Sequence, residues 1–553
     1  MKKLYLLFIF IILILTSCSF DGEIVKSFIS RIYNGSTDSV GSIYSYYLKD
    51  KGEIPYIKIE LIETIIDGIE YEVRYNDGNV VIKNKNNDEK CSIENNVITF
   101  DNYDSFFKPG KNDAPLNVIS RNNKYIEIND FEYTEGSKKV MDLNEYDIYL
   151  YQTSNSCYIP FAIFETIFLE VPYGINFVFN GSDYYSISDK NLFYRYQLTD
   201  YGTNYYSLLN GKEKSDNIKK FSYNQLLFVL DNFYGLKEKK NIDSFSNYFS
   251  SIGINEDNYS SKLIELTNYY LDDPHSSFIL PSIYDTYNES EINRQKKYYM
   301  GERQQNIQGA NDTLTELRKL YFRPKSIVKY PEFGEKFYVN DNIAYIIYDE
   351  FDFDSSIDLY GTNISRTIAE RDGFGYLYYY LNYIKNYEKK VDKVVIDISL
   401  NSGGYVDGAV DMLGFIKKNF SVNFKNSLTN SSIKINLNTD CNLDKNYKDL
   451  DSFEGVFDFY ILTSQASFSC ANTFASMLKE QNAATIIGED AAGGACVVQK
   501  ITLIDGIQLN ISGPIAFCDD NNNIIEDGVK VDYKIDRINM YNTSYMNLFI
   551  NNL

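Results

Sequence analysis

The chain has 553 residues, 44% of them hydrophobic and 16% aromatic, so it can bury a core and is not a disordered chain. Its length predicts two or three domains. The formal net charge of −22 would repel phosphates and argues against a nucleic-acid partner, and a single histidine with no CxxC spacing excludes the usual zinc sites, so we expect no metal and no cofactor.

Residues 1–17 are typical of a secretory signal peptide. Two lysines precede an unbroken apolar run, Leu4 to Leu15, which is too short to span a membrane comfortably. The run ends in "LTSC", which resembles the lipobox of bacterial lipoproteins and implies that Cys18 is lipidated. We therefore expect a protein of the cell envelope, anchored by lipid to the outer or cytoplasmic membrane on its extracytoplasmic side. The alternative is an ordinary signal peptide with a chance cysteine.

Two further segments precede the C-terminal part. Residues 18–204 contain short β-prone runs separated by turn signals such as "DG" and "NDGN", and predict a strand-rich α+β domain. Residues 205–337 contain apolar residues at helical spacing, as in "SYNQLLFVLDNFYGL", and predict a helical segment. This segment carries "LDDPHSSF", with the only histidine of the chain, His275.

Strands and helices alternate in residues 338–553. Apolar strand runs such as "KVVIDISL", "FDFYILTS" and "ATIIGED" are each followed by a loop, and the first two lead into helical patterns. This alternation predicts an α/β core with a parallel sheet and right-handed crossovers. Active sites on such cores lie at the loops that follow the carboxyl ends of the strands.

Two of these loops contain residue types that suit acyl transfer. In "DISLNSGGYVDGA", Gly403 and Gly404 allow close backbone approach, and their N–H groups are candidate donors to an oxyanion. In "TSQASFSCANTFA", Ser467 and Ser469 stand at a helix start, where a nucleophile gains from the helix dipole. Taken alone, the first loop is also an ordinary tight turn, and either serine is also an ordinary N-cap.

The order of these blocks resembles peptidase family S41, the C-terminal processing and tricorn-like peptidases. "IAYIIYDEF", "VVIDISLNSGGYVDGAV", "ILTSQASFSCANTFASMLKE", "TIIGEDAAGG" and "EDGVKVDYKI" follow the order of that family's motifs. The resemblance implies a core related to the ClpP and crotonase folds. It also implies Ser469 as the nucleophile, with the oxyanion held by the N–H of Cys470 and by Gly403 or Gly404.

One departure from the family bears on the mechanism. Many members use a Ser–Lys dyad, but the position of the lysine is Gly494 here. Another branch uses His, Ser and Glu, and "DDPHSSF" resembles its histidine segment. This resemblance implies His275 as the general base and Glu526, in "IIEDGV", as the acidic third member, with Asp527 as the adjacent alternative.

We therefore expect a serine endopeptidase that hydrolyses exported or unfolded polypeptides through Ser469, His275 and Glu526. Two alternatives remain open from the sequence. One is a catalytically inactive S41-like surface lipoprotein that acts as a binding protein. The other is an enzyme whose nucleophile is Cys470, since a cysteine at a helix start can be reactive.

Overall fold

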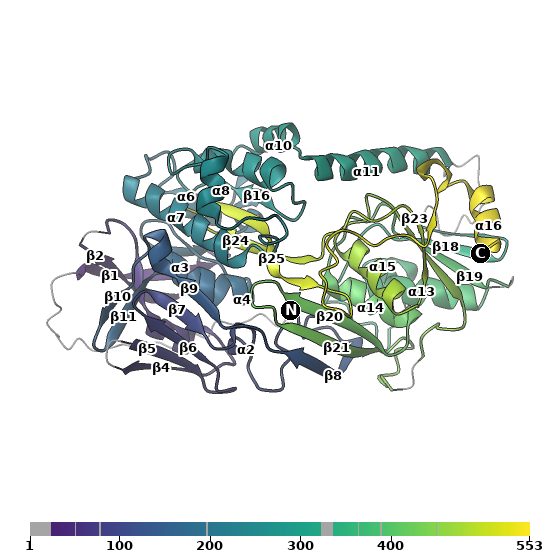
Figure 1. The fold of residues 1–553 in the computed structure, drawn as a ribbon, viewed down its shortest axis with the longest axis horizontal. Coiled ribbons are helices and arrows are strands. Elements are labelled where there is room, and N and C mark those ends of the chain that lie inside the picture. Colours follow the sequence, from purple (N-terminus) through teal and green to yellow (C-terminus); the bar gives the residue numbers. More distant parts are fainter. Residues whose placement is uncertain are drawn as a thin grey trace.

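The computed structural model describes residues 24–49, 51–76, 79–194, 197–321, 336–362, 364–387, 390–448 and 451–553. Cys18 and the predicted signal peptide lie outside the described residues. Figure 1 shows an elongated molecule, with the N-terminal sheets at one end and the C-terminal α/β part at the other. We call residues 336–553 the C-terminal core.

The C-terminal core is built on a six-stranded sheet in which five strands run parallel and only β17 is antiparallel. The strands, in their order across the sheet, are β17 (Phe337–Asn340), β18 (Ile343–Ile347), β19 (Lys393–Asp397), β22 (Asp458–Thr463), β23 (Thr485–Gly488) and β26 (Tyr533–Lys534). The predicted parallel α/β core is thus present.

Both faces of this sheet are covered by helices, which explains why its strands are apolar without alternation. Ala344 and Ile346 of β18 belong to the large core cluster, together with side chains of three helices on one face. Ile343 and Tyr345 point to the other face and pack with side chains of α11 and α16. The first set of helices is α13 (Gly373–Lys385), α14 (Val406–Ile416) and α15 (Cys470–Glu480), and the second is α11 (Glu302–Tyr321) and α16 (Thr543–Asn551).

A second six-stranded sheet joins all three parts of the chain. It contains β8 (Ile126–Thr134), β16 (Ser277–Leu280), β20 (Phe420–Asn426), β21 (Ser432–Thr439), β24 (Cys496–Thr502) and β25 (Gln508–Phe517). β8 comes from the predicted N-terminal domain and pairs with β21, while β16 comes from the predicted helical segment and pairs with β25. Strand pairing therefore crosses the segment boundaries that we drew from local patterns.

The N-terminal part is strand-rich, as its turn signals predict. A seven-stranded sheet contains β1 (Ile24–Asn34), β2 (Ser39–Leu48), β3 (Tyr56–Lys58), β10 (Tyr151–Thr153), β11 (Ser156–Pro160), β12 (Val178–Phe179) and β13 (Tyr184–Ser186). A five-stranded sheet contains β4 (Tyr71–Asn76), β5 (Asn79–Asn84), β6 (Lys90–Glu94), β7 (Val97–Phe100) and β9 (Lys139–Asp142). The apolar run after β11 forms α3 (Phe161–Glu165) and the helical turns that follow it.

The middle of the chain is helical. Its main elements are α7 (Asp216–Phe233), α8 (Phe245–Ser251), α9 (Tyr259–Glu265), the π-helical η4 (Leu266–Tyr270), α10 (Glu289–Tyr298) and α11. α11 is 20 residues long and runs from the helical part toward the C-terminal core (Figure 1).

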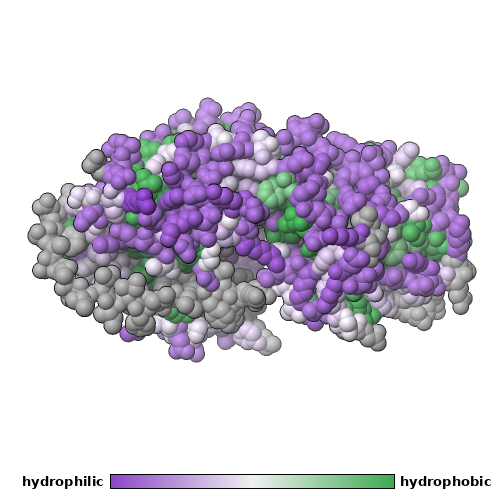
Figure 2. Space-filling model, turned by 90° about the horizontal axis from the view of Figure 1, so that it is seen from below, coloured by the Kyte–Doolittle hydropathy of each residue, from purple (hydrophilic) through white to green (hydrophobic). Residues whose placement is uncertain are grey.

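Where Figure 2 colours the surface seen from below, it is largely hydrophilic, with scattered apolar patches. No helix among the described residues is both long and apolar enough to cross a bilayer. Within the same residues, no group of three or more His, Cys, Asp or Glu side chains is arranged to hold a metal ion.

Candidate active site

Ser469 stands at the start of α15, directly after the loop that follows β22. Its backbone adopts φ +56° and ψ −125°, a strained conformation for a residue other than glycine. Two hydrogen bonds hold it: the Ser469 N–H donates to Gly493 O at 2.8 Å, and the Thr473 N–H donates to Ser469 O at 3.0 Å. The surrounding loops therefore fix the hydroxyl at the amino end of the helix, and strain of this kind is common at functional sites.

His275 lies in the turn between η4 and β16, where its loop is fixed by Asp273. The backbone N–H of His275 donates to Asp273 Oδ1 at 3.1 Å, and the hydroxyl of Ser276 donates to Asp273 Oδ2 at 2.6 Å. Antiparallel pairing of β16 with β25 joins this loop to the C-terminal core. The imidazole is buried.

The structure brings these two side chains together. His275 Nε2 lies 2.9 Å from Ser469 Oγ, although 194 positions separate the residues in the sequence. A hydrogen bond of this length between a base and a hydroxyl is the geometry that a serine nucleophile requires.

Burial lowers the pKa of His275 below its ordinary value, and the nearby cation of Arg303 lowers it further. The carboxylates of Asp273 and Glu526 act in the opposite direction and raise it. Because the net effect is a lowered pKa, the imidazole is neutral at pH 7 and is in the form that accepts a proton.

Of the two glycines in the first loop, Gly404 has the freer N–H group. The N–H of Gly403 donates to Asn401 Oδ1 at 2.8 Å, whereas the N–H groups of Gly404 and Cys470 donate to no other described residue. Gly403 lies against Ser469, since a Cβ at Gly403 would stand 2.7 Å from the Cβ of the serine. Free N–H groups at Gly404 and at the first residue of α15 are suitable donors to an oxyanion.

The side chains of Ser467 and Cys470, close to Ser469 in the sequence, make hydrogen bonds that hold the surrounding loops. Ser467 is fully buried, and its hydroxyl accepts from the Ser464 N–H and donates to Ile398 O. The thiol of Cys470 donates to Gly404 O at 3.2 Å, and burial raises its pKa to about 12. A thiol with such a pKa is protonated at neutral pH, which argues against Cys470 as the nucleophile.

Glu526 is buried beside the site, but it does not contact His275 directly. Its Oε1 accepts from Arg303 Nη1 at 2.7 Å and its Oε2 from the Ala495 N–H at 2.7 Å. The Nδ1 atom of His275 is buried and accepts or donates no hydrogen bond among the described residues. Asp527, the alternative, pairs with Lys239 and its side chain is 81% exposed, so of the two acids only Glu526 faces the site.

Arg303 is a charged side chain of this site to which the sequence assigned no role. It lies in the first turn of α11, within a polar segment that carries no recognisable motif. Only its position in the folded chain, next to Glu526, reveals it.

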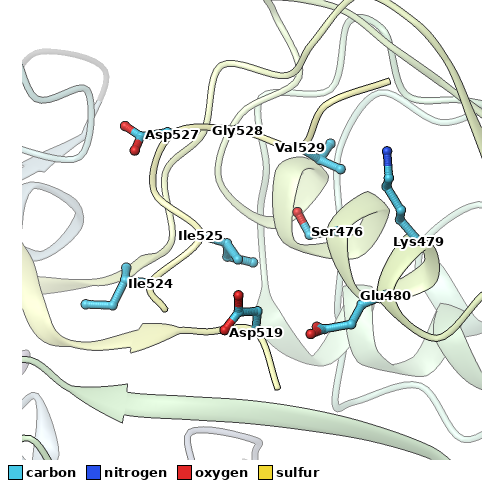
Figure 3. A pocket seen from close by; sticks show the side chains of 9 residues that line it. All are labelled: Ser476, Lys479, Glu480, Asp519, Ile524, Ile525, Asp527, Gly528 and Val529. Carbon is cyan, nitrogen blue, oxygen red and sulfur yellow. The ribbon is translucent and has the colours of Figure 1, made fainter. Parts of the chain in front are cut away.

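A separate pocket lies beside the second half of α15 and has a volume of about 280 Å³. Figure 3 shows the residues that line it, which are Ser476, Lys479, Glu480, Asp519, Ile524, Ile525, Asp527, Gly528 and Val529. Ser469, His275 and Glu526 are not among them, so this pocket is distinct from the reactive pair.

Residues 342–535 match the model of peptidase family S41. A search of curated proteins finds no match. Among solved structures, the chain is similar to the photosystem II D1 C-terminal processing protease, with 17% identity over 35% of this chain and 42% of that one and a TM-score of 0.26. The chain thus spans less than half of that protease.

Two other solved structures cover more of the chain. One is a peptidase from Parabacteroides merdae, described as putative. It has 15% identity, and the match covers 57% of this chain and 89% of that chain with a TM-score of 0.39. The other is a lipoprotein from Streptococcus agalactiae. It has 14% identity, and the match covers 62% of this chain and 98% of that chain with a TM-score of 0.34. The assignment of residues 342–535 rests on the family model.

Proposed function

We propose that this chain is a serine endopeptidase that uses Ser469, His275 and Glu526. Its residues 342–535 are an S41 peptidase domain, which makes the chain a serine peptidase. The observation that supports this choice of residues best is the 2.9 Å contact between His275 Nε2 and Ser469 Oγ. The C-terminal core, which carries Ser469 and Glu526, is in this proposal related to the ClpP and crotonase folds.

In the first half-reaction, Ser469 Oγ attacks the carbonyl carbon of the scissile peptide bond while His275 Nε2 takes the hydroxyl proton. The carbonyl oxygen becomes an oxyanion, which the N–H groups of Gly404 and Cys470 stabilise. When the intermediate collapses, the C–N bond breaks and His275 gives its proton to the leaving amine. An acyl-enzyme on Ser469 remains.

In the second half-reaction, His275 takes a proton from water, which attacks the acyl carbon, and the proton then returns to Ser469 Oγ as the new carboxyl product leaves. Glu526 stabilises the imidazolium through its charge, since its carboxylate raises the pKa of His275 without a direct hydrogen bond. No step in this sequence uses a metal or a cofactor.

Substrates in this proposal are exported or unfolded polypeptides, because Cys18 attaches the protein by lipid to the extracytoplasmic side of a membrane. Replacing Cys18 by Ala is expected to move the protein from the membrane fraction to the soluble fraction. Retention of the Cys18→Ala protein in the membrane fraction would contradict lipid anchoring.

The enzymatic proposal is tested with a serine-directed fluorophosphonate probe and with hydrolysis of an unfolded polypeptide such as casein. We expect the probe to label the parent on Ser469, and both labelling and hydrolysis to be lost in Ser469→Ala and to fall at least a thousandfold in His275→Gln. Unchanged hydrolysis by Ser469→Ala would show that the nucleophile is another residue.

A further inference from the structure

Arg303 makes contacts on both sides of the reactive pair. Its backbone N–H donates to Asp272 Oδ2 at 2.8 Å, and Asp272 lies in the same turn as His275. Its guanidinium reaches the C-terminal core, where Nη2 donates to Ala492 O at 3.0 Å and Nη1 to Glu526 Oε1 at 2.7 Å. One residue thus joins the loop that carries the base to the loops that surround the nucleophile.

We propose that Arg303 is a positioning residue that fastens the His275 loop to the C-terminal core and sets the separation between His275 and Ser469. This inference rests on the proposed function of that pair. The site is assembled from two parts of the chain, since Ser469 lies within the residues that match the S41 model and His275 lies outside them. A residue that holds these two parts together is therefore needed.

The ring of Phe468 contacts both His275 and Arg303. Its centroid is 4.6 Å from that of the His275 ring and 5.5 Å from Arg303 Cζ. Phe468 directly precedes Ser469. The guanidinium of Arg303 packs over the Phe468 ring, and the same ring contacts the imidazole of His275. Displacement of Arg303 would therefore alter the packing of the residue next to the nucleophile.

The geometry favours arginine over lysine at this position. The guanidinium donates through Nε and Nη2 to Ala492 O, through Nη2 to Glu526 O and through Nη1 to Glu526 Oε1. A lysine ammonium is a single point of charge and cannot reach all of these acceptors in one plane. We expect Arg303→Lys to retain the charge but to position the loop less well.

The charge of Arg303 also compensates that of Glu526 beside the imidazole. The charged groups that act directly on His275 are Asp273, Glu526 and Arg303. Farther out, Asp272, Tyr234, Lys240 and Cys496 interact with one or more of these three groups. Removal of Arg303 leaves the Glu526 carboxylate without its ion-pair partner, so the pKa of His275 should rise.

The chain offers a direct measurement of this effect, because His275 is its only histidine. Labelling of the histidine with ¹³C at Cε1 alone in the full-length protein gives one titrating resonance by NMR. We expect Arg303→Met to raise the pKa of His275 by about one unit, and Glu526→Gln to lower it. In the double variant the two changes should largely cancel, which a loss of structure alone would not produce.

Activity supplies the second measurement. We expect kcat/KM to fall by about a hundredfold in Arg303→Met and by about tenfold in Arg303→Lys, since small displacements of reacting groups have effects of this size. Arg318→Met is the matched control: Arg318 lies on the same helix, is 12% exposed and pairs with Asp349 and Asp397 of the core. That variant should lose thermal stability while the pKa of His275 stays as in the parent.

An Arg303→Met protein whose His275 titrates as in the parent, or whose kcat/KM equals that of the parent, would overturn the proposal. Equal shifts in Arg303→Met and Arg318→Met would also overturn it, because the effect would then belong to the helix as a whole. These outcomes differ from failure of the proposed function, which Ser469→Ala tests. The histidine titration needs no catalytic turnover.

Discussion

Gly494 lies against the ring of Phe468, so closely that a Cβ on the glycine would stand 2.4 Å from the Cε2 atom of that ring. The same ring contacts the imidazole of His275. A side chain at position 494 and the present packing of Phe468 beside His275 therefore exclude each other. In the proposed mechanism, a glycine in place of the lysine at position 494 thus leaves room for the packing of Phe468 beside His275.

The first prediction concerns this exclusion. Replacing Gly494 by Lys should lower kcat/KM at least tenfold and lower the midpoint of thermal unfolding, because the residue has φ +84° and its side chain would displace Phe468. Gly253→Ala is the control, since Gly253 has φ +73° and no neighbour within 4 Å of a Cβ. Full activity of a Gly494→Lys/His275→Gln double variant would instead indicate that a lysine dyad can form.

The second prediction is the pH dependence of hydrolysis. Because burial lowers the pKa of His275, kcat/KM should be constant above about pH 7 and fall tenfold per unit only below the lowered pKa. Because its pKa is lower in the folded state, His275 makes the free energy of unfolding larger above about pH 6.5 than in acid. This contribution of His275 to stability is lost as the pH falls through its folded-state pKa. A pH–rate profile compared with the NMR titration of His275 tests this prediction. An acid limb above pH 7 would contradict it.

The third prediction addresses the oxyanion donors. An alanine at Gly404, which has φ +137°, would place its Cβ 2.4 Å from Phe351 O and so move the N–H group. We expect kcat to fall by about a hundredfold with little change in KM, as is usual when an oxyanion donor is lost. Steady-state kinetics on one peptide substrate separates the two parameters. A raised KM with unchanged kcat would assign Gly404 to substrate binding.

The fourth prediction separates the thiol from the hydroxyl. Since burial raises the pKa of Cys470 to about 12, iodoacetamide should not inactivate the enzyme at neutral pH. Cys470→Ala should keep kcat/KM within about threefold of the parent and lose about 1 kcal/mol of unfolding free energy, from the hydrogen bond to Gly404 O. Inactivation of the parent by iodoacetamide, together with loss of hydrolysis in Cys470→Ala, would point to a catalytic thiol.

The fifth prediction distinguishes the two serines. Ser467→Ala removes a buried hydroxyl that serves the Ser464 N–H and Ile398 O, and we expect a loss of about 1–3 kcal/mol in the free energy of unfolding. Probe labelling of Ser469 should persist in the folded variant. Denaturant unfolding and labelling, measured on the same preparation, give the comparison with Ser469→Ala, for which the reverse pattern is expected.

Local patterns in the sequence were sufficient for the α/β core, because its four central strands are apolar over most of their length and are followed by a loop and helix or by the next strand. Motif order favoured Ser469 over Ser467, and Ser469 is the serine whose Oγ lies 2.9 Å from His275 Nε2. Local patterns did not predict how the predicted domains are joined, since β8 and β16 pair with strands far along the chain. Pairing of distant strands leaves no local signal.

The sequence by itself determined which residue types were available: one histidine, a serine at a helix start, two glycines after a strand and no lysine at position 494. Only the tertiary structure decided which of them meet. It brings His275 to Ser469, directs Glu526 inward and Asp527 to Lys239, and sets Arg303 against Glu526. The reason is physical: side-chain contacts between separate elements depend on how loops are held by backbone hydrogen bonds and strand pairing, and these are long-range interactions that spacing along the chain does not encode.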